Sequence, residues 1–218
     1  MSKPSAETSK LSVKRTQNRN RILDAAEALF YEKGFSSTPL RKIIKKSGLS
    51  TTVFYSFFPT KVDVLIGLIL PLGEEINRRL NAAFKDSTSD GDPIEKALHI
   101  ALQVCAKDRR LTKIFVTETA ALNLQSQGPL RKVTDRLKQI VIGQLDLGVA
   151  KGYFRSVDPT IFAYSFIATF DMHLYRWAVL GELSKQEMIG SARALAEVFR
   201  CGLPQSDRGK TKDKRKKG

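Results

Sequence analysis

Residues 38–61 read TPLRKIIKKSGLSTTVFYSFFPTK. This stretch predicts two short helices joined by a tight turn. Thr38 can cap the first helix, and Pro39 fits its first turn because the N–H that proline lacks has no partner inside a helix at that position. Gly48 permits the turn, since glycine adopts left-handed backbone conformations without strain, and Ser50 can cap the second helix.

Two short helices at this spacing have the layout of a helix-turn-helix, whose second helix enters the DNA major groove. The alternative is an ordinary pair of antiparallel helices inside a helical bundle. The sequence around the pair favours DNA binding. The apolar anchors of the two helices are Ile43 and Ile44 in the first, and Val53, Phe54 and one of Phe57 and Phe58 in the second.

A longer helix is predicted before this pair, from Thr16 to Lys33, and Gly34 follows where a left-handed residue commonly closes a helix. Three helices with a small core and a cationic flank predict a compact DNA-binding head. The buried stripe, at amphipathic spacing, is Ile22, Leu23, Ala25, Ala26, Leu29 and Phe30. The cations on the opposite face and upstream are Lys10, Lys14, Arg15, Arg19 and Arg21.

The net charge of this 218-residue chain is +15, and it is unevenly distributed. Residues 1–61 hold twelve Lys and Arg against four Asp and Glu, a net charge of +8, and residues 204–218 hold seven against two, a net charge of +5. The 142 residues between them therefore carry only +2 (15 − 8 − 5). A basic head on a near-neutral body is the charge pattern of a phosphate-binding module. Binding of the basic ends to an anionic membrane is the alternative, but such ends usually accompany a lipid anchor or a basic amphipathic helix.

No apolar run reaches the roughly 18 residues needed to span a bilayer, and residues 1–14 lack the apolar stretch of a signal peptide. We therefore expect a soluble cytoplasmic protein that is nucleoid-associated when bound to DNA and has no membrane partner. The two cysteines, Cys105 and Cys201, lie far apart on mostly apolar segments. This predicts buried free thiols, with a redox switch as the open alternative.

After Thr60, a predicted N-cap, the chain reads as further helices without the two-residue alternation of strands. Pro71 is expected to kink or interrupt the first of them. Asp-Pro pairs at 92–93 and 158–159 mark helix starts, and Ser184 with Glu187 predicts a capping box. The prediction is an all-α protein of about nine helices. Its parts are a flexible basic arm (1–14), a helix-turn-helix domain (15–62), a helical ligand-binding and dimerisation domain (63–203) and a disordered basic tail (204–218).

The last two predicted helices indicate a dimer. Residues 161–170 are apolar or small at nearly every position, so they must be covered on both sides, and the final helix has an apolar stripe with small alanines. Packing this pair against its symmetry mate would form a four-helix bundle, whereas the alternative is that the same stripe is intramolecular core. The predicted dimer residues are Ile161, Ser165, Ala168, Met188, Ala192, Leu195 and Phe199.

In these features the chain resembles the TetR-type transcriptional regulators. Beyond residue 65 the resemblance is architectural. It implies a homodimer on a palindromic double-stranded DNA operator, released by a small-molecule effector in the helical body. The residues that carry the resemblance are Arg19, Ile22, Leu23, Ala25, Ala26, Leu29, Phe30, Gly34, Thr38, Ile43, Ser47, Gly48, Leu49, Ser50, Phe54, Tyr55, Phe58, Lys61 and Leu65.

Carried over residue by residue, the resemblance implies that Tyr55 lies against the DNA backbone and that Lys61 opens the fourth helix at a phosphate. The chain departs from the family at four positions. The family often has Ala where Ile44 stands, and Gly or Pro where Thr52 stands. It often has Thr or Ser in place of Val53, and His or Tyr in place of Phe57. These departures change which bases the head can recognise, because Val53 lacks the hydroxyl that Thr or Ser would offer. A valine can still contact a thymine methyl. The predicted DNA-binding residues are Thr38, Arg41, Lys42, Thr51, Thr52, Val53, Tyr55, Phe57 and Lys61.

Polar or aromatic residues on otherwise apolar helices are the candidates for an effector pocket, although each alone also fits a place in the core or at the dimer contact. Together they could line a mostly apolar pocket, which predicts an apolar or aromatic effector. Phe170, His173 and Trp177, on one face of a helix, are the first candidates. The predicted pocket residues are His99, Gln103, Phe115, Thr119, Phe166, Phe170, His173 and Trp177, with Asn123 and Asp171 beside them.

The chain lacks the residue sets of common active sites, because its two histidines are seventy-four residues apart and it has no Cys-x-x-Cys. We expect no enzymatic activity, no metal and no cofactor. The favoured function is a repressor that an effector releases from DNA. The main alternative is a ligand-independent architectural or nucleoid-associated DNA-binding protein with the same head, and a helical binding module that has lost DNA binding is a third.

Overall fold

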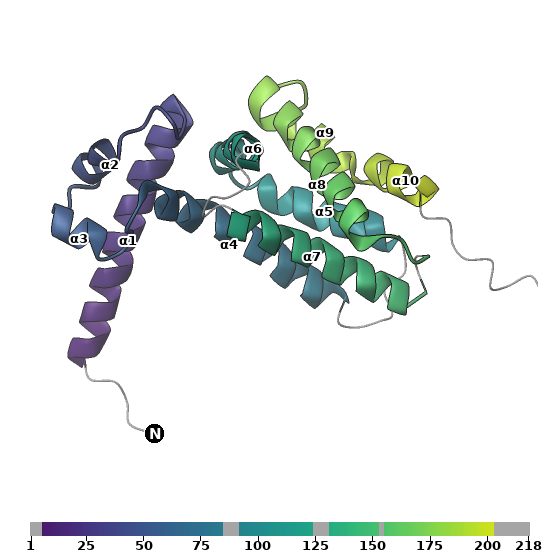
Figure 1. Ribbon diagram of the computed structural model, residues 1–218, viewed down its shortest axis with the longest axis horizontal. Coiled ribbons are helices and arrows are strands. Elements are labelled where there is room, and N and C mark those ends of the chain that lie inside the picture. Colours follow the sequence, from purple (N-terminus) through teal and green to yellow (C-terminus); the bar gives the residue numbers. More distant parts are fainter. Residues whose placement is uncertain (1–5, 85–91, 124–130, 153–154, 203–218) are drawn as a thin grey trace, which may run out of the picture.

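The computed structural model describes residues 6–84, 92–123, 131–152 and 155–202, and every regular element within them is a helix (Figure 1). This confirms the all-α prediction. The head contains α1 (Ala6–Lys33), α2 (Leu40–Ser47) and α3 (Thr51–Tyr55). The body contains α4 (Lys61–Phe84), α5 (Pro93–Cys105), α6 (Arg109–Asn123), α7 (Arg131–Ala150), α8 (Pro159–Tyr175), the π-helical turn η1 (Arg176–Leu180), α9 (Lys185–Gly190) and α10 (Ala192–Gly202).

The head is held together by the apolar stripe of α1. Ile22 and Ala26 of α1, Ile43 of α2 and Phe54 of α3 are fully buried against one another in a single apolar cluster. Figure 1 shows that α4 leaves the head and continues into the body. The boundary expected after residue 62 therefore falls inside the first turn of α4, and the buried apolar cluster runs without interruption from the head into the body.

Helix starts agree with the caps expected from the sequence. Ser50 Oγ accepts the backbone N–H of Val53 (3.3 Å), and the Asp92 and Asp158 carboxylates cap α5 and α8, each followed by proline. Ser184 forms the predicted capping box at the start of α9. These caps satisfy backbone N–H groups that have no partner inside the helix, so each fixes where its helix begins.

Three expectations for the helices are wrong in detail. The first helix begins at Ala6 rather than Thr16, because residues 6–15 contain no Pro or Gly to stop it, so most of the expected flexible arm is helical. α4 is not interrupted at Pro71, which lies on its exposed side. The last helix is divided into α9 and α10 at Ser191, whose hydroxyl donates to the Met188 carbonyl (2.7 Å).

In the body, α5 is covered by α4 on one side and by α9 and α10 on the other, while α7 packs along α8. α6 packs against α1 of the head and against α8 and η1 of the body. Arg200 of α10 forms an ion pair with Asp92, which fixes the end of α10 beside the start of α5. The head and the body therefore meet through two helices, α4 and α6.

Candidate nucleic-acid interface and ligand cavity

The turn between α2 and α3 is fixed by a side chain of α1. Gly48 has the left-handed conformation (φ +64°) that the sequence predicts, and the Arg21 guanidinium donates to its carbonyl (3.2 Å). A Cβ atom on Gly48 would lie 2.8 Å from Arg21 Nη2, so any other residue there would displace the guanidinium as well as strain the backbone. Arg21 was expected only as part of the cationic flank; its role in the turn depends on the approach of α1, which sequence spacing does not give.

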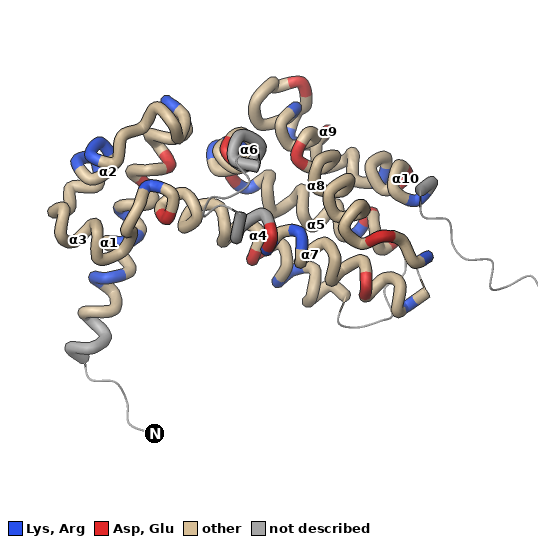
Figure 2. Tube along the Cα trace, in the orientation of Figure 1, with Lys and Arg blue, Asp and Glu red and all other residues tan. Residues whose placement is uncertain are grey.

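The outer surface of α2 and α3 carries most of the predicted DNA-binding side chains. Arg41, Lys42, Thr51, Thr52 and Tyr55 are exposed. Figure 2 shows Lys and Arg gathered on α2 and along α1, at the end of the molecule opposite α10. A cationic, hydroxyl-bearing surface around the start of a capped helix is suited to phosphates and base edges.

Val53 and Phe57 are half-buried, because the remainder of each side chain packs into the head. The Arg15 guanidinium lies over the Phe57 ring (5.8 Å to the centroid), and Arg19 lies over Phe58 (5.6 Å). These contacts align a row of α1 cations with α3. The same surface therefore extends from α2 and α3 onto α1.

Thr38 is the exception among the predicted DNA-binding residues. It is fully buried, and its hydroxyl donates to the carbonyl of Gly34 (2.7 Å) and lies within reach of that of Leu29 (3.4 Å). Pro39, not Thr38, occupies the N-cap position of α2, and no side chain caps that helix. The capping prediction is wrong because the hydroxyl is used to close the end of α1, and a buried Thr38 has no surface for DNA.

Lys61 lies at the junction of the head and the body. Its Nζ donates to the Phe35 carbonyl (2.8 Å) and lies 4.2 Å from the centroid of the Phe35 ring. Burial lowers the pKa of Lys61, and Glu118 partly opposes this. The ammonium therefore holds the loop after α1, which leaves its remaining N–H groups for the predicted phosphate contact.

α6 makes a second set of contacts with the head. The Glu118 carboxylate accepts the backbone N–H of Phe35 (3.2 Å), and Arg110 pairs with Glu27 (3.5 Å). The Arg110 and Lys113 cations lie over the Tyr31 ring, at 4.9 and 4.7 Å from its centroid. These polar and cation–π contacts link α6 to the end of α1 and to the loop that follows it.

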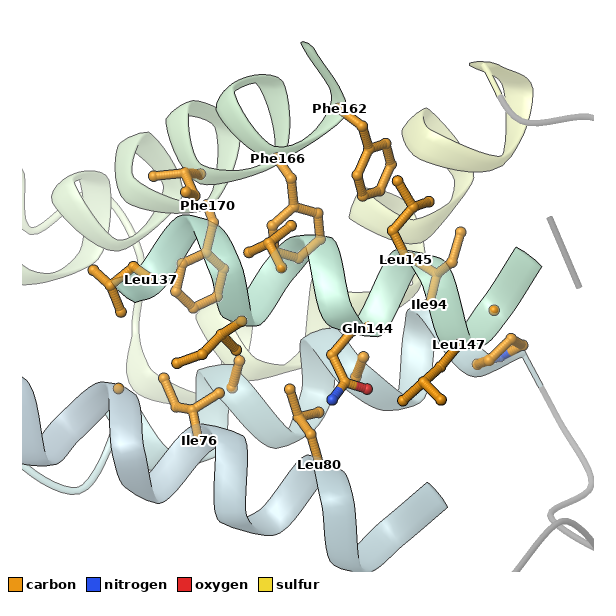
Figure 3. A pocket seen from close by; sticks show the side chains of 18 of the residues that line it. Ile76, Leu80, Ile94, Leu137, Gln144, Leu145, Leu147, Phe162, Phe166 and Phe170 are labelled. Atoms are coloured by element: carbon orange, nitrogen blue, oxygen red, sulfur yellow. The ribbon is translucent and has the colours of Figure 1, made fainter. Parts of the chain in front are cut away.

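A cavity lies between α4, α5, α7 and α8, with Phe115 of α6 also in its wall. It encloses about 1310 Å³ of space free of protein atoms, including its open mouth. In Figure 3, Phe162, Phe166 and Phe170 follow one another along α8 and face Ile76 and Leu80 across the cavity. Further apolar lining comes from Leu72, Phe84, Ile94, Ala97, Ala101, Leu137, Ile140, Val141, Leu145, Leu147 and Ile167.

Of the predicted pocket residues, Phe115, Phe166 and Phe170 line this cavity. His99 and Gln103 are exposed and hydrogen-bonded to each other (3.0 Å), because they occupy the outer face of α5.

His173 and Trp177 are buried outside the cavity lining. The His173 ring is hydrogen-bonded to Ser191, and the Trp177 carbonyl accepts from Arg109 (2.8 Å). The side chains of Thr119 and Asn123 lie outside the described residues. The α7 lining was missed, although Leu137, Ile140, Val141, Gln144 and Leu145 have the spacing of one helix face.

Ionisable groups in the lining lie toward opposite ends of the cavity. Asp171 and Cys105 occur with Phe115 near α6, whereas Lys151 occurs with Phe84 and Pro93 at the other end. Burial raises the pKa of Asp171 to about 7.

The cysteine in this lining is a protonated thiol. Burial and the neighbouring Asp171 carboxyl raise the pKa of Cys105. A redox switch needs a thiolate, so Cys105 matches the buried thiol that the sequence predicts. The Cys201 side chain lies outside the described residues.

The predicted dimer residues separate into two groups. Ile161, Ser165 and Ala168 of α8 are exposed, as a dimer contact requires. The others lie inside the protomer: Met188, Ala192 and Phe199 are buried and Leu195 is half-buried against the same core. That part of the prediction is wrong for the three buried residues, because α9 and α10 turn their apolar sides onto α5. The spacing of an apolar stripe does not show whether the same chain or a partner covers it.

Within the described part of the chain, no His, Cys, Asp and Glu side chains are grouped as metal ligands would be. No helix among these residues is both long and apolar enough to cross a membrane.

Two family descriptions match this chain. "Bacterial regulatory proteins, tetR family" matches residues 22–68, and "Tetracyclin repressor-like, C-terminal domain" matches residues 88–198. The HTH-type transcriptional repressor KstR2 of Mycobacterium tuberculosis is 25% identical over 163 residues, which are 73% of this chain and 80% of that protein.

Two solved structures share the fold. The crystal structure of a TetR-family transcriptional regulator of Syntrophomonas wolfei has a TM-score of 0.75 at 26% identity, covering 86% of this chain and 96% of the other. The regulator FadR of Bacillus subtilis, crystallised with stearoyl-CoA, has a TM-score of 0.67 at 20% identity, covering 82% and 96%.

Proposed function

Because this chain belongs to the tetR family of bacterial regulatory proteins, we propose that it is a repressor that leaves its operator when an elongated apolar ligand enters the cavity. The family consists of transcriptional regulators rather than enzymes, so the chain is a DNA-binding transcriptional regulator. Repression, the operator and the ligand are the proposed parts.

The observation that carries the proposal is that α6 belongs to both regions. Phe115 of α6 lines the cavity, while Arg110 and Glu118 of the same helix contact Glu27 and Phe35 of the head. A ligand that displaces Phe115 therefore shifts the helix that holds the head. Since a ligand changes a conformational equilibrium only by its difference in affinity for the two states, it must bind more tightly when the heads no longer fit DNA.

The lining favours a long ligand. Residues from Ile94 to Cys105 of α5 follow one wall, and a rise of about 1.5 Å per residue gives a cavity of about 16 Å. The polar residues Asn77, Asn81 and Arg136 lie in a depression that shares Gln144 with the cavity, which provides a place for a polar end. FadR, crystallised with stearoyl-CoA, makes an acyl chain a reasonable first probe.

For DNA, we propose that Arg41, Thr51 and Thr52 read base edges while Lys42 and Tyr55 contact the backbone. Val53 and Phe57 add apolar contacts from the exposed parts of their side chains, and Lys61 contacts a phosphate through the N–H groups that Phe35 does not use. Phosphate contacts fix the register of the head and base contacts give the sequence preference.

We propose further that the protein is a homodimer through α8 and α10, which would place two heads on a palindromic operator. The exposed apolar side chains there include Ile161 (67% exposed), Met172 (59%) and Val198 (63%). Ile161→Glu combined with Val198→Glu should give monomers by light scattering and weaken binding to a two-half-site duplex. Val13→Glu, at an exposed apolar position on α1, is the control and should remain dimeric.

The main test selects bound fragments from the source genome and repeats the selection with stearoyl-CoA and other apolar metabolites. We expect a palindromic motif whose recovery falls when a ligand is present. Ala97→Phe, which fills the cavity, should still bind the motif and lose the ligand response. Ala82→Phe adds the same ring on the exposed side of α4 and should keep it. Equal ligand responses of the two variants would reject the cavity as the effector site.

The competing function is a ligand-independent architectural or nucleoid-associated protein, for which the basic head is the supporting observation. It predicts recovery of many unrelated fragments and no metabolite effect in the same selection. Under either function we propose a cytoplasmic protein that associates with the nucleoid through DNA.

A further inference from the structure

Asp171 is the acidic residue in the cavity lining, and its surroundings are apolar. It follows Phe170 on α8 and lies close enough to Cys105 of α5 for its charge to affect that thiol. Phe115 of α6 and Phe166 are also in this part of the lining. The carboxyl therefore lies at the end of the cavity that adjoins α6, the helix that holds the head.

Among the described residues, no side chain or backbone group forms a hydrogen bond or ion pair with the Asp171 carboxyl. Burial raises its pKa to about 7, with no cation nearby to oppose the effect. Carboxyls used to hold a core together are paired or hydrogen-bonded, since burying them otherwise is unfavourable. The Asp171 carboxyl therefore has no partner within the described part of the protein, which leaves its polar atoms available to a molecule in the cavity.

We propose that Asp171 selects the effector, by hydrogen bonding to a hydroxyl or carbonyl oxygen at the end of the ligand that enters deepest. This inference rests on the proposed function and adds a chemical class to it: an elongated apolar molecule with a neutral oxygen group at the inner end. A carboxylic acid has one donor and one free acceptor. It therefore matches both the donor and the acceptor of a hydroxyl, and its donor matches a carbonyl.

A neutral oxygen fits this end of the cavity better than a cation. The rings of Phe166 and Phe170 are stacked nearly parallel, with centroids 6.2 Å apart and 10° between their planes. The ring of Phe162 also stacks with that of Phe166, with centroids 6.0 Å apart and 30° between the planes. The rings thus turn part of their faces toward one another rather than toward a ligand cation. Lys151 in the lining and the net charge of +15 also disfavour entry of a cation.

The test uses two probes of matched shape, 1-decanol and 1-chlorodecane, which differ in the ability to donate a hydrogen bond. Affinities are measured by calorimetry for the full-length protein and for Asp171→Asn and Asp171→Leu. The ratio of the two affinities in the leucine variant corrects for their different hydrophobicity. We expect the ratio of decanol affinity to chlorodecane affinity to be about tenfold higher in the natural protein than in the leucine variant. Asp171→Asn should keep most of the preference, since an amide also donates and accepts.

Operator binding and circular dichroism show that each variant is folded. Equal preference in all three proteins, with both probes still bound, would overturn the role of Asp171 and leave the proposed function intact. Failure of both probes to bind any of the three proteins would remove the apolar ligand and this inference with it. Decylamine serves as a third probe: tighter binding of the amine than of decanol, abolished in Asp171→Asn, would also overturn the proposal, because the residue would then pair with a cation.

Discussion

Replacing Asp171 by Asn should stabilise the protein, and only above mildly acidic pH. The folded-state pKa of about 7 lies above the ordinary value of 3.8, so ionisation of this carboxyl opposes folding. The penalty is absent below about pH 4, grows as the pH rises to about 7 and is constant above that. Each pKa unit corresponds to about 1.4 kcal/mol, which gives roughly 4 kcal/mol for the full difference.

At pH 8 the free energy of unfolding of the Asp171→Asn variant should exceed that of the natural protein by about 2 to about 4 kcal/mol. The lower value applies if water enters the cavity and solvates the carboxylate. Urea unfolding can be followed by the fluorescence of the sole tryptophan, Trp177, which is buried beside α6. The curves of the two proteins should coincide near pH 4 and separate by pH 8 at equal protein concentration. Asp146→Asn, at an exposed site on α7, is the control. If the stability difference between the natural protein and the Asp171→Asn variant did not change with pH and equalled that of the control, the reasoning would be refuted.

Two further changes test the head. Gly48→Ala should lower the free energy of unfolding by about 1–2 kcal/mol because of the positive φ at this position. It should also displace Arg21 and therefore reduce operator affinity. Gly152→Ala, with φ +74° and open space around it, is the control that should show the backbone strain alone in thermal unfolding. Lys61→Ala should lower the salt dependence of DNA binding by a slope of about 1 and reduce stability by about 1 kcal/mol through the lost hydrogen bond. Lys185→Ala, exposed on α9, should change neither, and an unchanged slope for the Lys61 variant would count against its phosphate contact.

The sequence predicted those features that depend on residues a few positions apart. Ser50 and Ser184 cap helices because the N–H groups they accept lie three residues ahead. Gly34 and Gly48 have positive φ because one ends a helix and the other forms a turn that few other residues tolerate. Such local chemistry is complete within one turn of chain, so no knowledge of the tertiary structure was needed.

The predictions that were wrong concern side chains whose burial depends on which helices pack against each other. Met188 and Phe199 have the spacing of an exposed dimer stripe, but α9 and α10 bury them in the core beside α5. His99 and Gln103 were chosen as polar residues on an apolar helix, yet their polarity marks the solvent side of α5. Phe166 lines the cavity because a large ring on a helix that is apolar all round must face the interior on some side.

The head surface and the cavity share no side chain, although α6 connects the two. Under the proposed function, randomising lining positions such as Ala97 and Val141 should change which compound is detected while the promoter that responds stays the same. A library built on these positions, sorted by a fluorescent reporter, would make this scaffold a source of biosensors for hydrophobic metabolites.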